Sequence, residues 1–348
     1  MKRLLTALLI MIEPMVAYGD YREFRAVPVD SAMAEALTRT AETTLKEFPK
    51  LTADNLAMSI VDLTKPDSLI RADYHGDAPF YPASVVKLFF MVAMFHQGHI
   101  TPEIDRALHE MISLSDNDAA AFLLDVLTGT TSGPELDEKA LETFIGRRRS
   151  LNRYFASLGY DVSVMMKPWS FGPFGRDMQM MADKPVNRNR VTSNSVGSLL
   201  LWIVRRHAIS PQASEAMLAL LERPLAPPRP TENQVKEYLG AALPEGSRLW
   251  SKEGDTSEVR HDAAYVELPD GRKLILVALT RGAADDPTLL PAIGRHVLTE
   301  VRENRVTEGG GRRSEVGGQR TEDRGTQLPV AIALRAVPKI RHVSFHRF

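Results

Sequence analysis

The chain of 348 residues contains no cysteine. This absence excludes disulfides, thiolate zinc sites and cysteine nucleophiles. The formal net charge is only −1, so the charge balance does not favour nucleic acid or an anionic membrane as a partner. No apolar run beyond the N-terminus is long enough to span a bilayer. The composition, 44% hydrophobic and 25% charged, is typical of a globular protein.

The first residues have the pattern of a signal peptide. Lys2 and Arg3 precede a short apolar run, and small residues follow around Ala17 and Gly19. We therefore expect residues 1–19 to direct export to the periplasm or the exterior. An uncleaved anchor and a misassigned start codon are the alternatives.

The order of predicted elements indicates the fold class. Periodicity predicts helices and strands in turn along the chain. The helices are expected at 31–48, 84–95, 104–114, 117–127, 196–206 and 287–302, and the strands at 55–63, 68–74, 248–254, 261–268 and 273–280. Strands at both ends imply one antiparallel sheet, formed by about 50–75 and 247–281, with a mostly helical part at about 84–246 between them. The sequence thus predicts one α+β domain over residues 30–303.

The C-terminal residues differ in composition from the rest of the chain. From Asn304 onward the sequence is rich in glycine and arginine and lacks periodicity. We expect residues 304–348 to be disordered. A basic arm that binds an anionic partner is the alternative.

Lys87 lies in the apolar stretch "YPASVVKLFF", three residues after Ser84. Residues three apart share a helix face, so the amine is expected beside the hydroxyl. Burial among apolar side chains favours the neutral amine, which can take the serine proton and create a nucleophile. The alternative is a surface helix whose lysine extends to water.

Two further motifs contain polar residues in unusual positions. Ser115-Asp116-Asn117 precedes a helix, where a helix cap at Asn117 or Asp118 is the simpler explanation. Lys252-Glu253-Gly254 lies on a predicted strand, where a solvated edge lysine is the simpler explanation.

The three motifs occur in the order Ser-x-x-Lys, Ser-Asp-Asn, Lys-x-Gly. This order is the signature of class A β-lactamases and penicillin-binding proteins. The chain resembles these penicillin-recognising serine hydrolases from about Asp30 to Arg302. The resemblance implies a β-lactamase/transpeptidase-like fold, with a five-stranded antiparallel sheet flanked by helices and an all-helical subdomain.

The resemblance also implies catalytic roles. Ser84 would be the acylated nucleophile and Lys87 its activating base. Ser115 would relay a proton to the leaving nitrogen, and Lys252 would hold the proton network and attract a substrate carboxylate.

Four residues would contact the substrate by the same resemblance. Asn117 would bind a substrate amide, and Glu253 and Gly254 would line the site on their strand. The amide of Asp255 would complete an oxyanion hole with that of Ser84.

Three departures from the family pattern bear on function. Only 31 residues separate Ser84 from Ser115, about half the usual spacing, which predicts a more open site. No Glu-x-x-Leu-Asn lies between 167 and 192. There Asp177 is a possible deacylation base, with a loop-stabilising salt bridge as its alternative role. Glu253 replaces a hydroxyl residue, and its charge would repel a carboxylate unless a cation such as Arg260 neutralises it.

The sequence therefore predicts a serine hydrolase that forms an acyl-enzyme on Ser84. Its substrate would be a β-lactam or a related amide or ester of the cell envelope, either a small molecule or peptidoglycan-like. A penicillin-binding or D,D-peptidase-like protein with slow deacylation and a non-catalytic envelope module are the alternatives. We expect a monomer that requires no cofactor and no metal, since His96 and His99 lack further candidate ligands nearby.

Overall fold

The computed structural model describes residues 19–311 except 171, 183–184 and 227–233, with side chains as far as Arg302. The predicted signal peptide lies almost wholly outside the described residues, as does the chain after residue 311. The chain divides into two compact units after Thr307, and the description below concerns the first.

Eleven α-helices and six strands lie within the described residues. The helices are α1 (Tyr21–Ala26), α2 (Ser31–Glu47), α3 (Lys87–Gln97), α4 (Pro102–Ser113), α5 (Asn117–Thr128), α6 (Glu138–Arg148), α7 (Ser150–Ser157), α8 (Gly175–Met181), α9 (Ser193–Val204), α10 (Pro211–Leu221) and α11 (Leu289–Gly311). The strands are β1 (Leu56–Asp62), β2 (Ile70–Tyr74), β3 (Glu222–Arg223), β4 (Arg248–Asp255), β5 (Val259–Glu267) and β6 (Lys273–Arg281).

The strands form one antiparallel sheet in the order β2-β1-β6-β5-β4-β3. The predicted α+β class and antiparallel sheet are confirmed, but the sheet has six strands rather than five. The extra strand is β3, whose two residues pair with Trp250 and Leu249 of β4. A strand of two residues has no detectable alternation, so periodicity could not predict it.

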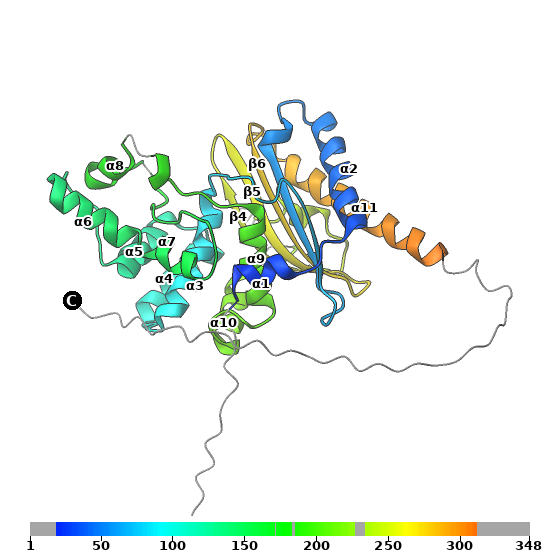
Figure 1. The fold of residues 1–348 in the computed structure, drawn as a ribbon, viewed down its shortest axis with the longest axis horizontal. Coiled ribbons are helices and arrows are strands. Elements are labelled where there is room, and N and C mark those ends of the chain that lie inside the picture. The colour runs from blue at the N-terminus through cyan, green and yellow to red at the C-terminus, as the bar shows by residue number, and fades with distance from the viewer. Residues whose placement is uncertain (1–18, 171, 183–184, 227–233, 312–348) are drawn as a thin grey trace, which may run out of the picture. The chain divides into compact units, whose positions relative to one another are not determined.

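Helices cover both faces of the sheet. On one face, α2 and α11 pack their apolar side chains against β1, β5 and β6. On the other face, α9 and α10 pack against the sheet together with α3 and α5 of the helical part. Figure 1 shows α3 to α8 gathered on the side of the sheet away from α2 and α11.

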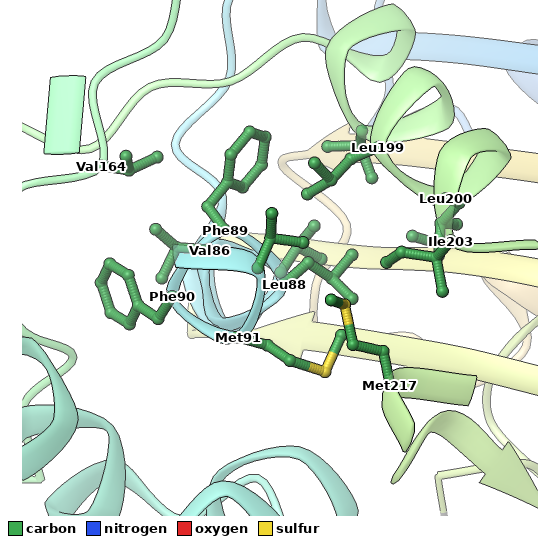
Figure 2. Packing of buried hydrophobic residues seen from close by; sticks show 14 of the residues in the cluster. Val86, Leu88, Phe89, Phe90, Met91, Val164, Leu199, Leu200, Ile203 and Met217 are labelled. Carbon is green, nitrogen blue, oxygen red and sulfur yellow. The ribbon is translucent and has the colours of Figure 1, made fainter. Parts of the chain in front are cut away.

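Helix α3 lies at the centre of the larger core. Leu88, Phe89 and Met91 are fully buried and are surrounded by side chains of α9 and α10 (Figure 2). Burial of each such side chain stabilises the fold by about 1.5–3 kcal/mol relative to exposure. Lys87, the first residue of this helix, is therefore held in a fixed position among apolar side chains.

The C-terminal helix is longer than predicted. The predicted helix ends at residue 302 and the predicted disordered tail begins at Asn304, but α11 continues to Gly311. No glycine or proline interrupts the residues from Asn304 to Glu308, so this segment can continue the helix. No helix in the described part of the chain is both long and apolar enough for a membrane span.

Candidate active site

Ser84 lies in a single 3₁₀ turn, Ala83–Val86, that leads directly into α3. The backbone of Ala83 has a φ of +45°, a conformation that is strained for a residue with a side chain. Ser84 is partly exposed, whereas Ala83, Val85 and Val86 are buried. Within the described residues, no acceptor takes the amide hydrogen of Ser84. The turn thus presents both a hydroxyl and a free N–H group.

Strand β4 packs directly against this turn. A Cβ atom added to Gly254 would lie 2.8 Å from the Ser84 nitrogen and 2.9 Å from the Val85 nitrogen. Only glycine permits this close approach of two backbones. Asp255 follows at once, so its amide and that of Ser84 belong to neighbouring segments. Two backbone N–H groups in this arrangement are suited to stabilise an oxyanion.

The side chain of Lys87 is completely buried. Its Nζ donates to the main-chain oxygen of Ser115 at 2.5 Å and to Oδ1 of Asn117 at 2.8 Å, and it lies 3.4 Å from Ser115 Oγ. A neutral amine has two hydrogens and one lone pair, so these two short bonds leave the lone pair available. No carboxylate in the described part of the chain contacts this amine.

The direct hydrogen bond expected between Ser84 and Lys87 is not formed. Within the described residues nothing joins the Ser84 hydroxyl to Lys87 Nζ, because the amine is held by Ser115 and Asn117 instead. Hydrogen bonds between nucleophile and base are often long before substrate binds. The two groups remain one turn apart on the same segment.

Ser115 holds the centre of the site from the turn between α4 and α5. Its φ is +57°, which is unfavourable for a serine and common at functional sites. Asp116 caps α5 by accepting from the Ala119 amide at 2.6 Å. The simpler explanation of this motif was thus partly correct, but Asp116 is the cap rather than Asn117. Asn117 is therefore free to bind Lys87.

Lys252 extends the network from β4. Its Nζ donates to Ser115 Oγ at 2.8 Å and to Glu253 Oε1 at 2.6 Å, and its side chain is fully buried. Glu253 is also buried, so the two side chains form an internal ion pair. Arg260, which the sequence suggested as the neutralising cation, pairs with Glu237 instead.

The electrostatics of the two lysines differ. Burial, together with the charge of Lys252, lowers the pKa of Lys87 to about 7. Burial also lowers the pKa of Lys252, although the charge of Glu253 opposes this shift. Burial alone would raise the pKa of Glu253, but the charges of Lys252 and Arg223 hold it below its usual value. Lys87 is therefore an amine that exchanges protons near neutral pH, whereas Glu253 stays ionised.

The arrangement joins four predicted residues into one chain of contacts. Lys87, Ser115 and Lys252 are linked by hydrogen bonds, and Asn117 holds the first of these residues. Acyl transfer through a proton relay needs a nucleophilic hydroxyl, a base and a second proton carrier. Here these are Ser84, the amine of Lys87 with its lowered pKa, and the hydroxyl of Ser115, which is bound to Lys252.

Asp177 lies elsewhere, buried on α8. Its Oδ1 is 3.4 Å from Nη2 of Arg148, and its Oδ2 has no hydrogen-bond partner among the residues that the structure describes. The same guanidinium contacts Asp125 at 2.9 Å, and Lys167 binds Asp125 at 2.5 Å. This is the salt bridge that the sequence offered as the alternative role of Asp177. A role in deacylation stays a prediction without a contact to support it.

A second buried carboxyl group beside the site was not predicted. Asp262 of β5 lies directly across from Glu253 in the strand register, and burial together with the charge of Glu253 raises its pKa to about 7. The signal was present in the sequence, because two charged residues occupy the strand segment "VRHDAA". The register of the two strands was needed to place them.

Residues 99–301 match the sequence profile of the Beta-lactamase enzyme family. This match covers more than half of the chain. The chain belongs to that family. The predicted likeness to β-lactamase-like serine hydrolases is thereby confirmed. No curated protein sequence matches the chain.

Solved structures related to this β-lactamase-family chain share its fold at low identity. A variant of PBP-A, solved as an acyl-enzyme with penicillin G, has 19% identity and a TM-score of 0.55, covering 77% of this chain and 97% of its own. A β-lactamase from Sphaerobacter thermophilus DSM 20745 has 20% identity and a TM-score of 0.53, with coverages of 76% and 96%. A β-lactamase from Xanthomonas campestris pv. campestris str. ATCC 33913 has 17% identity and a TM-score of 0.56, with coverages of 79% and 99%.

Proposed function

We propose that this member of the β-lactamase family is a serine hydrolase that forms an acyl-enzyme on Ser84. The observation that carries the proposal is the buried amine of Lys87, one turn from Ser84. Among the described residues, it is bound only by neutral oxygens of Ser115 and Asn117. A lysine buried among neutral partners is a base rather than a structural cation.

Acylation follows from the positions of these groups. Ser84 Oγ attacks the substrate carbonyl carbon while its proton passes to Lys87 Nζ. The amides of Ser84 and Asp255 receive the developing oxyanion. When the carbon–nitrogen or carbon–oxygen bond breaks, the proton moves through Ser115 to the leaving atom. Attack of water on the acyl-enzyme then releases the carboxylic acid and restores the serine.

The proposed substrate is a β-lactam or a related amide or ester of the cell envelope. Membership of the family and the complete Ser-x-x-Lys and Ser-Asp-Asn motifs support this substrate class. The predicted signal peptide supports export to the compartment that contains the envelope. We propose that the protein acts there as a monomer.

Slow deacylation is a second form of this function, as in a penicillin-binding protein. One observation favours it: Asp177 is held by Arg148 in the interior. Asp183, the other acid between 167 and 192, lies outside the described residues. Without a base for water the acyl-enzyme accumulates, since loss of a general base costs about 10²–10⁴ in rate.

The test uses two acyl donors and the purified protein. A fluorescent penicillin at high concentration and a neutral fluorophosphonate should each add one adduct to the intact mass, located at Ser84 by peptide mapping. Ser84→Ala should lose both adducts. A chromogenic cephalosporin then separates turnover from trapping. No adduct from either reagent on folded wild-type protein would contradict the proposal and support a non-catalytic module.

A further inference from the structure

Glu253 removes the positive charge of Lys252 from the surroundings of the site. Its Oε1 lies 2.6 Å from Lys252 Nζ, and only 4% of Glu253 is exposed. A carboxylate at this distance in the interior cancels most of the field of the ammonium group. Lys252 therefore cannot attract an anionic substrate as an unpaired lysine would.

A second carboxyl group lies beside Glu253 on the neighbouring strand. Glu253 and Asp262 are direct partners in the register of β4 and β5, and both are buried. Asp262 Oδ2 accepts from the Leu239 amide at 3.0 Å. Asp262 Oδ1 and Glu253 Oε2 have no hydrogen-bond partner within the described residues. Two buried carboxyl groups thus lie opposite each other, one on β4, the strand that packs against the Ser84 turn, and one on β5.

The nearby cations are occupied. Arg223 donates to the main-chain oxygens of Ile112, Leu220 and Glu222. Arg260 donates to Glu237 and to the main-chain oxygen of Ala284.

The histidine of β5 is not a cation either. His261 Nδ1 accepts from the Thr280 amide at 3.1 Å, so its hydrogen lies on Nε2, 2.8 Å from the main-chain oxygen of Tyr81. Both nitrogens of a neutral ring are thereby satisfied, and burial lowers the pKa of this histidine to about 4. Arg248, at the start of β4, pairs with Glu222 and Glu267. Across the described part of β4 and β5, no unpaired cation therefore remains to receive a substrate carboxylate.

We infer that the acyl donor of this site carries an uncharged or cationic group, not a carboxylate, where it lies along β4, and that Glu253 determines this preference. The inference rests on the proposed acylation of Ser84 and names its substrate class. A substrate carboxylate along β4 would find the charge of Lys252 already cancelled by Glu253, with a carboxylate beside it and no unpaired cation of β4 or β5 to bind it, which is a selective element against anionic donors.

The experiment compares a matched pair of donors that differ only in this charge. Penicillin G and its methyl ester share every group except the carboxylate. The second-order rate of adduct formation at Ser84 is measured for each by intact mass. For the wild type we expect the ester to react about 10-fold faster or more, after correction for its intrinsic reactivity with hydroxide. A faster reaction of the free acid would overturn the inference and leave the proposed function standing.

Variants assign the preference to its residue. Glu253→Gln keeps the size of the side chain and removes its charge, and Glu253→Thr restores a hydroxyl. Both should shift the ratio of the two rates toward the free acid by about 10-fold. The control, Glu245→Gln, removes one exposed charge ahead of β4 and should leave the ratio unchanged. An unchanged ratio in both Glu253 variants would overturn the role of that residue.

Two features keep this test decisive. The ratio is taken on one preparation, so a partly folded variant changes both rates equally. If neither Glu253 variant folds, the wild-type ratio alone still decides the substrate class. Absence of any adduct from both donors and from the fluorophosphonate would overturn the proposed function itself, and the inference with it.

Discussion

Two groups of buried cations in this protein have opposite partners. Lys87, beside Ser84, donates to a main-chain oxygen and a side-chain amide. Arg148 and Lys167, in the region of α5, α6 and α8, contact the carboxylates of Asp125 and Asp177. A buried cation with carboxylate partners stays charged and holds elements together, whereas one with neutral partners loses its proton more readily. The partners, not the burial, indicate which group performs chemistry.

Lys252 has partners of both kinds, one neutral and one charged. It contacts the neutral hydroxyl of Ser115 and the carboxylate of Glu253. It is therefore suited to hold a proton network in place while Lys87 exchanges protons. The same comparison explains why the two lysines of the site have different expected roles.

The largest expected effect comes from Lys87→Met. Loss of the base should lower the rate of Ser84 acylation by about 10²–10⁴-fold. The stability should change by no more than about 1 kcal/mol, because the lost hydrogen bonds and the relieved burial of an amine oppose each other. The measurements are adduct formation with the neutral fluorophosphonate and thermal unfolding. Acylation at the wild-type rate would show that Lys87 is not the base.

Arg148→Met should give the reverse result. It leaves the carboxylates of Asp125 and Asp177 without their cation, and breaking a buried ion pair in this way costs about 3–5 kcal/mol of unfolding free energy. Denaturant unfolding measures the loss. Acylation by the fraction that remains folded should match the wild type. Arg153→Met, which removes an exposed arginine of α7, is the control and should change stability by less than about 0.5 kcal/mol.

These contrasts mark what the sequence could predict. Motif order predicted the family, and the three motifs bring Lys87, Ser115 and Lys252 into one hydrogen-bond network. The predicted contact between Lys87 and Ser84 is not formed, because a short motif does not specify which neighbour holds the amine. Periodicity predicted the antiparallel sheet and its helical insertion. The pairing of Glu253 with Lys252, rather than with Arg260, depends on side-chain directions across β4 and β5. Composition and spacing contain no information on such directions, so a register was required.

The ion-pair partner of Asp177 could not be predicted from the sequence for the same reason. Its partner Arg148 is 29 residues away in the chain, and no local pattern links α6 to α8. Arg176, which precedes Asp177 in the chain, donates to the main-chain oxygen of Pro134 instead. Long-range ion pairs of this kind depend on how helices pack, which single-sequence patterns do not specify.

Asp177→Asn tests whether Asp177 has a structural role, as an ion-pair partner, or a chemical one. Removal of one carboxylate from Arg148, with Asp125 still present, should cost about 1–3 kcal/mol of stability. The decay of the labelled acyl-enzyme, followed by intact mass after excess donor is removed, should proceed at the wild-type rate. A decay slowed by tenfold or more, with unchanged acylation, would instead identify Asp177 as the deacylation base.

The smallest expected effect is a shift in the pH dependence of acylation. Because the pKa of Lys87 is lowered to about 7, its amine is protonated below pH 7 and cannot accept the serine proton. The acylation rate should therefore fall about tenfold per pH unit below 7 and level off above it. The negative charge of Glu253 raises the pKa of Lys87, so Glu253→Gln should move the midpoint to lower pH. Rates with the neutral fluorophosphonate from pH 5 to 9 give both midpoints. A midpoint that does not move would mean that the charge of Glu253 does not affect the pKa of the base.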